Sequence, residues 1–154
     1  MNFFDDLTYQ YKKGGYSNKI IFWNVGAFLL SFFFYQFKIG VFNFPIGLPL
    51  DSSPTALLYQ PWTLITYAFL HTGFLHLFFN LMIFNFSSQL FLTFFSQKQL
   101  LGLYVLSALF AGLSFVGVFY LMGTTSKIIG SSAAVMAILV ATTTYQPLME
   151  IRLF

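Results

Sequence analysis

Charged residues and cysteine are what this 154-residue sequence lacks most. Only 7% of its residues are Asp, Glu, Lys or Arg, whereas a typical soluble domain has roughly 25%. The absence of cysteine excludes disulfides, thiolate zinc sites and thiol catalysis, so a nucleophilic serine would have no sulfur competitor. The net charge of +3 is small and scattered, so the sequence predicts no nucleic-acid partner.

Hydrophobic residues are abundant instead, and they lie in long runs. They make up 58% of the chain, which is more than a soluble fold could bury. A helix that crosses a bilayer needs about 20 apolar residues. The runs predict an all-α, polytopic membrane bundle with spans at 20–37, 74–95, 100–122 and 131–145, with a tight turn at 97–99.

Three parts of the chain are separated by these runs. Residues 1–18 are polar and are expected to form an N-terminal segment rather than a secretory leader. Residues 19–145 are expected to form the membrane domain. Residues 146–154 contain a charged turn and the start of another apolar segment, so we expect a chain truncated after its fourth span, on the way to a fifth.

The connection between the first two spans, residues 39–62, combines proline with apolar residues. Four prolines in this length prevent a regular helix, because proline lacks the backbone donor and clashes with the preceding turn. The apolar residues between them favour a loop lying in the membrane interface. A connection this long inside a compact domain is often functional, so we expect it to face a substrate.

The basic residues predict the orientation, because cytoplasmic loops of membrane proteins are enriched in lysine and arginine. With the N-terminus in the cytoplasm and the chain in the cell membrane, the inner side holds Lys12, Lys13, Lys19, Lys98 and Arg152. The outer side then holds only Lys38 and Lys127. The 39–62 loop and the start of the last span would both face outward.

The last predicted span opens with two serines behind a glycine, Gly130-Ser131-Ser132. The apolar run around them, residues 128–141, would be about 21 Å long as a helix, whereas the hydrocarbon core is roughly 30 Å thick. This helix is therefore expected to start below the membrane surface, sheltered by the bundle. A hydroxyl near the positive end of its dipole could act as a nucleophile. Alternatively, a serine caps the helix and the glycine permits a tight turn.

A histidine and an asparagine, His76 and Asn80, lie in the second predicted span about 40° apart around the helix, so both point the same way. His71 precedes Gly73 and is expected in the loop region. Polar residues within a span are functional candidates by default, and these two could donate to a developing oxyanion. Alternatively, they join helices through hydrogen bonds. Metal binding is not expected, because no third ligand lies near the two histidines in sequence.

In order and spacing, these residues resemble the rhomboid intramembrane serine proteases. The resemblance covers roughly residues 20–145 and rests on Trp62, His71, His76, Asn80, Gly130 and Ser132. The conjunction of these motifs is much more specific than any one of them. It implies a six-helix core that hydrolyses peptide bonds in or beside the transmembrane segments of other membrane proteins, without cofactor or metal.

The resemblance also implies a role for each of these residues. Ser132 matches the nucleophile, and His76 and Asn80 match side chains that line the oxyanion hole. His71 matches a structural position that ties the outer loop to the helix start. Gly130 and Trp62 are further structural supports. The 39–62 loop matches a membrane-embedded hairpin beside the substrate gate.

Three positions depart from the family pattern. The general base of the family is a histidine on the sixth span, which these four expected spans do not include. A serine without a base stays protonated and is a poor nucleophile, so this chain alone is expected to be inactive. Thr63 stands where members often have arginine, and Ala133 stands where they often have glycine. Both changes are expected to be tolerated, since alanine is nearly as small as glycine and the arginine position is away from the chemistry.

The leading hypothesis is therefore an intramembrane serine endopeptidase with transmembrane proteins as substrates and the lipid bilayer as its surroundings. Its substrate, cleavage preference and oligomeric state are left open. The alternative is a rhomboid-like pseudoprotease that binds transmembrane helices without cleaving them, although a binding module has no need of the serine. An unrelated transporter or channel subunit would need more inward-facing polar residues on the third span, which offers Tyr104, Ser107, Ser114 and Tyr120.

Overall fold

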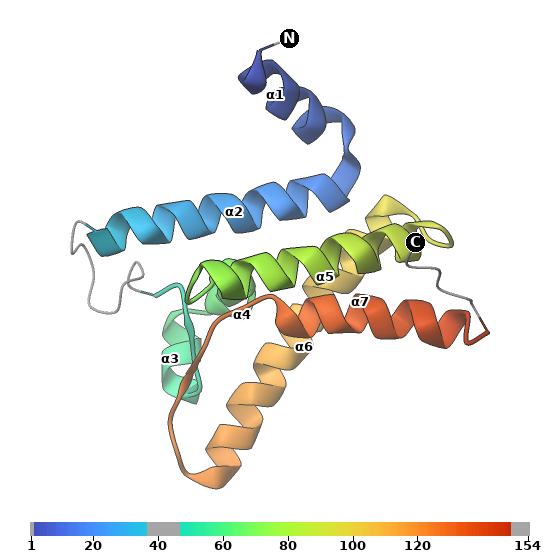
Figure 1. Cartoon of the computed structure of the whole chain (residues 1–154). Helices are drawn as coiled ribbons and strands as arrows, with labels where there is room; N and C mark the ends of the chain where they lie inside the picture. The colour runs from blue at the N-terminus through green and yellow to red at the C-terminus, as the bar shows by residue number, and fades with distance from the viewer. Residues whose placement is uncertain (1, 37–46, 149–154) are drawn as a thin grey trace.

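Helices dominate the structure, a computed structural model that describes residues 2–36 and 47–148. The predicted all-α fold class is confirmed (Figure 1). In chain order the elements are α1 (Phe3–Lys13), α2 (Gly15–Gln36), β1 (Leu50–Asp51), α3 (Pro54–Tyr59), α4 (Thr63–Thr66), the 3-10 helix η1 (Tyr67–Phe69), α5 (Phe74–Leu92), α6 (Gln97–Met122), β2 (Lys127–Ile128) and α7 (Ser132–Tyr145).

Two helices in the described part of the chain, α5 and α6, are long and apolar enough to cross a membrane. Many of their apolar side chains are exposed, which suits contact with lipid: Phe74 of α5 and Phe110 of α6 are 67% and 68% exposed. The helix α7 is apolar but shorter. The expected first span at 20–37 falls on α2, except for its last residue. That residue, residue 38 and residues 39–46 of the outer loop lie outside the described residues.

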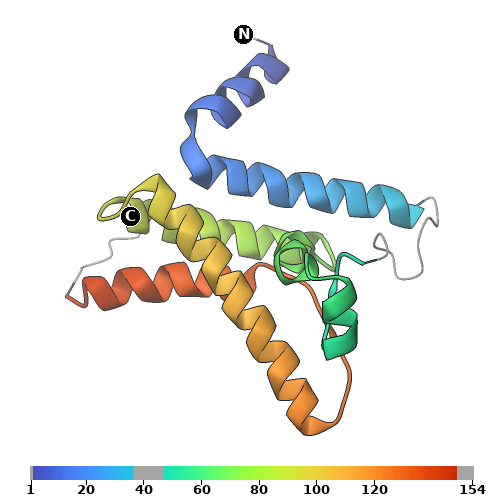
Figure 2. The same ribbon diagram turned by 180° about the vertical axis from the view of Figure 1, so that it is seen from behind.

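Four helices, α2, α5, α6 and α7, pack against one another. In Figure 1, α2 lies along one side of α5 and α7 lies along the other, and Figure 2 shows α6 crossing them obliquely. The helix α7 packs against both α5 and α6, and α2 packs against the same two helices. Their buried side chains meet in one core, formed by Ile20, Phe84, Phe91, Leu100, Tyr104, Ala134, Val135 and Ile138.

The turn between α5 and α6 lies three residues earlier in the chain than the sequence suggests, because α5 ends at Leu92 and α6 begins at Gln97. Residues 97–99, expected to form a tight turn, are the first turn of α6. Ser96 caps this helix: the Gln99 amide donates to the Ser96 hydroxyl at 3.3 Å, and the Ser96 amide donates to the Gln99 side chain at 2.8 Å. This reciprocal capping box satisfies two backbone donors that have no partner within the helix, which stabilises a start at Gln97.

The N-terminal segment is largely helical. The helix α1 occupies most of the polar segment 1–18, and α2 begins at Gly15, before the expected start of the first span at residue 20. The Asn2 amide donates to the Asp5 carboxylate at 3.3 Å, and lysines 12 and 13 lie in the last turn. Acidic residues near the start of a helix and basic residues near its end complement the helix dipole, so this polar sequence favours a helix.

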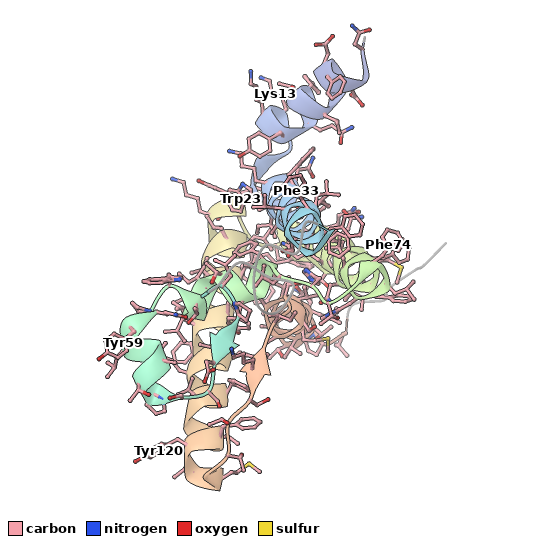
Figure 3. All side chains as sticks on the ribbon, turned by 90° about the vertical axis from the view of Figure 1, so that its left-hand side faces the viewer. Lys13, Trp23, Phe33, Tyr59, Phe74 and Tyr120 are labelled. Carbon is pink, nitrogen blue, oxygen red and sulfur yellow. The ribbon has the colours of Figure 1, made fainter. Side chains whose placement is uncertain are left out.

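The outer loop contains a strand that pairs with the segment entering α7. The strands β1 and β2 are antiparallel, with Leu50 opposite Ile128 and Asp51 opposite Lys127. Next to this pair, the Ser52 amide donates to the Ser126 carbonyl at 2.9 Å, and the Ser126 amide donates to the Ser52 hydroxyl at 2.8 Å. Figure 3 shows the pair beside α6, with α3 and Tyr59 lying away from Phe74 of α5. The outer loop is thus fixed to the chain that leads to the two serines.

A glycine on α6 lets the outer loop approach this helix closely. A methyl group on Gly112 would lie 3.0 Å from the side chains of both Leu50 and Leu64 and 3.3 Å from that of Tyr67. These distances are tighter than ordinary van der Waals contact, so a larger residue would push the loop away. The small residue therefore serves the packing of β1, α4 and η1 on α6.

Candidate active site

The two serines occupy different environments at the start of α7. Ser131 is the N-cap residue and is buried, whereas Ser132 is the first residue of the helix and is exposed. The Ser131 hydroxyl makes no capping hydrogen bond, so the capping alternative does not describe this residue. Gly130 precedes them with a φ of +123°, and its amide donates to the Tyr67 carbonyl at 2.9 Å. We call residues 130–132 the serine turn.

The exposed serine and His76 meet at Gly130. A methyl group on Gly130 would lie 3.1 Å from both Cε1 and Nε2 of His76 and 3.7 Å from the Ser132 hydroxyl oxygen. The imidazole edge and the hydroxyl therefore border the same small space, which the missing side chain of the glycine leaves free. Its φ lies in the region that favours glycine, so the backbone needs this residue for a second reason.

Asn80 is one turn further along α5 and is 8% exposed. Its amide nitrogen donates to the His76 carbonyl at 2.8 Å, a bond within its own helix. His76 and Asn80 therefore lie on one face of α5, but the amide group is not bonded to the serine turn.

His71 lies between η1 and α5, in the loop region where the sequence places it, and is 2% exposed. Its Nε2 and the Ser131 hydroxyl share a hydrogen bond of 3.2 Å. Its ring contacts that of His76 edge-on, with 5.0 Å between the ring centroids. Burial, followed by the charge of His76, lowers the pKa of His71 from 6.5 to about 4. The ring is therefore neutral at physiological pH.

Thr72 was not singled out from the sequence, yet it contacts His76. Its hydroxyl and Nδ1 of His76 share a hydrogen bond of 3.1 Å. This contact uses one ring nitrogen and leaves Nε2, the nitrogen beside Gly130, for other partners. Thr72 lies before Gly73 and outside α5, so the helical periodicity that relates His76 to Asn80 does not extend to it.

Trp62 belongs to the outer loop and not to the serine turn. Its indole nitrogen donates to the Gly47 carbonyl at 2.7 Å, and the ring is 52% exposed. Nearby, the Thr66 hydroxyl donates to the Leu48 carbonyl at 2.7 Å. Both bonds close the outer loop onto α4, in keeping with a structural role for the tryptophan.

The polar residues of α6 do not form a continuous inward path. Tyr104 is buried, but its hydroxyl donates to the Ala68 carbonyl at 3.0 Å, whereas Tyr120 is 68% exposed and lies near the end of α6 (Figure 3). This arrangement gives no support to the transporter hypothesis. Among the described residues there is also no group of three potential metal ligands.

The fold and the serine turn define a class of protein. It is a helical membrane protein with a serine hydroxyl at the start of a short, packed helix. The family model of the Rhomboid domain matches residues 59–154, which is more than half of the chain and includes both histidines, Asn80 and the serine turn. The chain belongs to the rhomboid family and is an integral membrane protein. No curated protein and no solved structure gives a significant match.

Proposed function

We propose that the protein is an intramembrane serine endopeptidase that cleaves peptide bonds in or near the transmembrane segments of membrane-protein substrates. The observation that carries this proposal is the convergence of the Ser132 hydroxyl and His76 Nε2 on the space beside Gly130. Ser132 is exposed at a helix start, where backbone amides and the helix dipole favour negative charge. Attack by its oxygen on a peptide carbonyl would form an acyl-enzyme that water then hydrolyses.

The oxyanion of this reaction would be held by donors from two helices. The Ser132 amide belongs to the free start of α7. If the Thr72 hydroxyl donates to Nδ1 of His76, the ring carries its proton on Nε2, which faces Gly130 and can donate to the oxyanion. Asn80 would add a third donor once its amide turns from the His76 carbonyl toward the substrate.

The proton of Ser132 requires a base. In the described part of the chain, no side chain is hydrogen bonded to the Ser132 hydroxyl, and His71 is committed to Ser131. The proposed reaction therefore uses a further histidine, which the family resemblance places on a sixth span. A serine without such a base would stay protonated and would be a poor nucleophile.

The alternative function is that of a pseudoprotease that binds transmembrane helices. The same lack of a bonded base among the described residues is the observation that favours it. Both functions fit a multi-pass protein of the cell membrane with a cytoplasmic N-terminus, in which the 39–62 loop faces outward beside the entering substrate.

Labelling with a fluorophosphonate, which reacts with activated serines, separates the two functions. The protein expressed from its complete coding sequence should be labelled and should cleave a reporter transmembrane substrate. Ser132→Ala should abolish both, whereas the matched control Ser131→Ala should retain measurable cleavage. A protein that is not labelled but still crosslinks to transmembrane helices, equally with and without Ser132→Ala, would be a pseudoprotease.

A further inference from the structure

Two buried tyrosines exchange hydrogen bonds between η1 and α6. The Tyr67 hydroxyl of η1 donates to the Ala108 carbonyl of α6 at 2.8 Å, and the Tyr104 hydroxyl of α6 donates to the Ala68 carbonyl of η1 at 3.0 Å. Both tyrosines are 1% exposed. We call this reciprocal pair the tyrosine clamp. Two bonds in opposite directions prevent η1 from sliding or rotating on α6.

The segment held by the clamp also holds the serine turn. The Tyr67 carbonyl accepts from the Gly130 amide at 2.9 Å. Four residues further along the chain, His71 shares its hydrogen bond with Ser131 at 3.2 Å. The two residues that immediately precede Ser132 are therefore both bonded to residues 67–71. The position of η1 on α6 sets the position of the serine turn.

Asn24 extends this network to α2. Its amide nitrogen donates to the Ile20 carbonyl at 2.8 Å and lies 3.4 Å from the Tyr104 hydroxyl oxygen. Asn24 is 1% exposed, and its side-chain oxygen has no hydrogen-bond partner among the described residues. An amide that donates to a tyrosine oxygen leaves the tyrosine hydrogen free to point at its own acceptor. Asn24 thereby directs the Tyr104 hydroxyl toward the Ala68 carbonyl.

We propose that Tyr104 and Asn24 are positioning residues for the reaction of Ser132, acting through η1 and the serine turn. The inference rests on the proposed function. A nucleophile must be held within about 0.5 Å of its productive place, and an error of about 1 Å can lower the rate roughly 100-fold. The hydrogen bonds described above join both side chains to the serine turn, and their effect on the reaction is transmitted through these bonds.

The test compares Tyr104→Phe with Tyr120→Phe, which removes a hydroxyl from the exposed end of the same helix. Leu100→Val is a second control, because it weakens packing in the same core and removes no hydrogen bond of the network. In fluorophosphonate labelling of the full-length protein, Tyr104→Phe should lower the maximal inactivation rate about five- to tenfold with little change in the inhibitor concentration at half-maximal rate. Asn24→Ala should lower it about threefold, and both controls should leave it unchanged.

A second measurement does not depend on activity. With ¹⁵N labelling of histidine in the full-length protein, the ring signals that disappear in His71→Gln are those of His71. Tyr104→Phe should shift the His71 Nε2 signal, which reports its bond to Ser131, whereas Tyr120→Phe should not. If Tyr104→Phe does not fold, Asn24→Ala is measured in its place.

The outcomes separate the two proposals. If labelling depends on Ser132 but Tyr104→Phe slows it no more than Leu100→Val, the positioning role is wrong and the peptidase proposal stands. If labelling does not depend on Ser132, the peptidase proposal fails, and an unchanged His71 signal in Tyr104→Phe would then overturn the clamp as well. A shifted His71 signal in Tyr104→Phe would show that the clamp holds the serine turn although the protein is not a peptidase.

Discussion

His71 is bonded to Ser131 and not to Ser132, with 3.2 Å between its Nε2 and the Ser131 hydroxyl oxygen. The bond divides two adjacent serines between two tasks. Ser131 turns inward and ties the start of α7 to the chain before α5, while Ser132 remains exposed. A nucleophile benefits from this division, because its neighbour can be held rigidly without using its own hydroxyl.

Replacing Gly130 by alanine should damage both stability and activity. A non-glycine residue at a φ of +123° is strained by about 1–3 kcal/mol, and its methyl group would press on His76 at 3.1 Å. We expect cleavage of a reporter substrate to fall by about 100-fold, because a displacement near 1 Å is enough for that loss. Gly102→Ala is the matched control, since no atom beyond the adjacent residues and backbone of its own helix lies within 4 Å of the added methyl group. Equal activity of the two variants would contradict the assigned place of the serine turn.

Removing an oxyanion donor should lower turnover while leaving the fold intact. We expect His76→Ala and Asn80→Ala each to lower kcat by about 100-fold, the usual effect of losing one such donor. Asn85→Ala provides the control, because this exposed asparagine of α5 bonds only one turn along the helix, to Gln89. If Asn80→Ala keeps full turnover, the Asn80 amide is not an oxyanion donor, and its bond to the His76 carbonyl only stabilises the helix.

The link between the outer loop and the serine turn should depend more on a hydroxyl than on an ion pair. Ser52→Ala removes the acceptor of the Ser126 amide and should lower the free energy of unfolding by about 1 kcal/mol. Asp51→Asn weakens only the half-exposed pair with Lys127, at 3.8 Å, and keeps the oxygen that accepts from the Ser53 amide. We expect less than about 0.5 kcal/mol from this change. Denaturant unfolding in detergent micelles measures both, and the reverse order would contradict the proposed role of Ser52.

Acid should destabilise the fold through His71, which precedes α5. Its pKa in the folded protein is lowered to about 4 by burial and by the charge of His76, whereas in the unfolded chain it returns to 6.5. Above pH 6.5 the residue is neutral in both states and contributes no pH dependence. As the pH falls from 6.5 to about 4, only the unfolded chain binds the proton, so stability falls by up to about 3 kcal/mol.

The measurement for this prediction is the thermal midpoint between pH 4 and pH 8, compared with that of His71→Gln. The variant cannot take up the proton at this position, so its midpoint should fall less over the same range. An identical pH dependence of the two proteins would show that another group causes the acid sensitivity.

Hydropathy predicts the helices well because lipid leaves few alternatives to a helix with internally bonded backbone. Spacing also indicates that His76 and Asn80 share a face, since both lie within one regular helix. The capping signals before α1 and α6 were present in the sequence, at Asn2 and Ser96, but hydropathy gave them no weight. Helix ends are decided by these local polar contacts and not by the apolar runs.

The contacts between distant segments could not be predicted in this way. The tyrosine clamp joins residues 41 and 36 positions apart, and the bond between the Asn24 and Tyr104 side chains spans 80. Each of these bonds involves a side chain that fits an ordinary apolar helix equally well. Their partners are set by the way the helices cross, which periodicity along one helix does not encode.

The pairing of β1 with β2 turns the chain from Asp51 to Lys127 into a closed ring whose base is held without a covalent bond. Both histidines are inside this ring, and the serine turn lies just beyond it. The entropy of closing a ring rises only with the logarithm of its length, so a few residues inserted between α5 and α6 would cost little. The β1–β2 pair that closes the ring would not tolerate inserted residues in the same way. Peeling the two strands apart would release the serine turn from the outer loop while every long helix stayed whole.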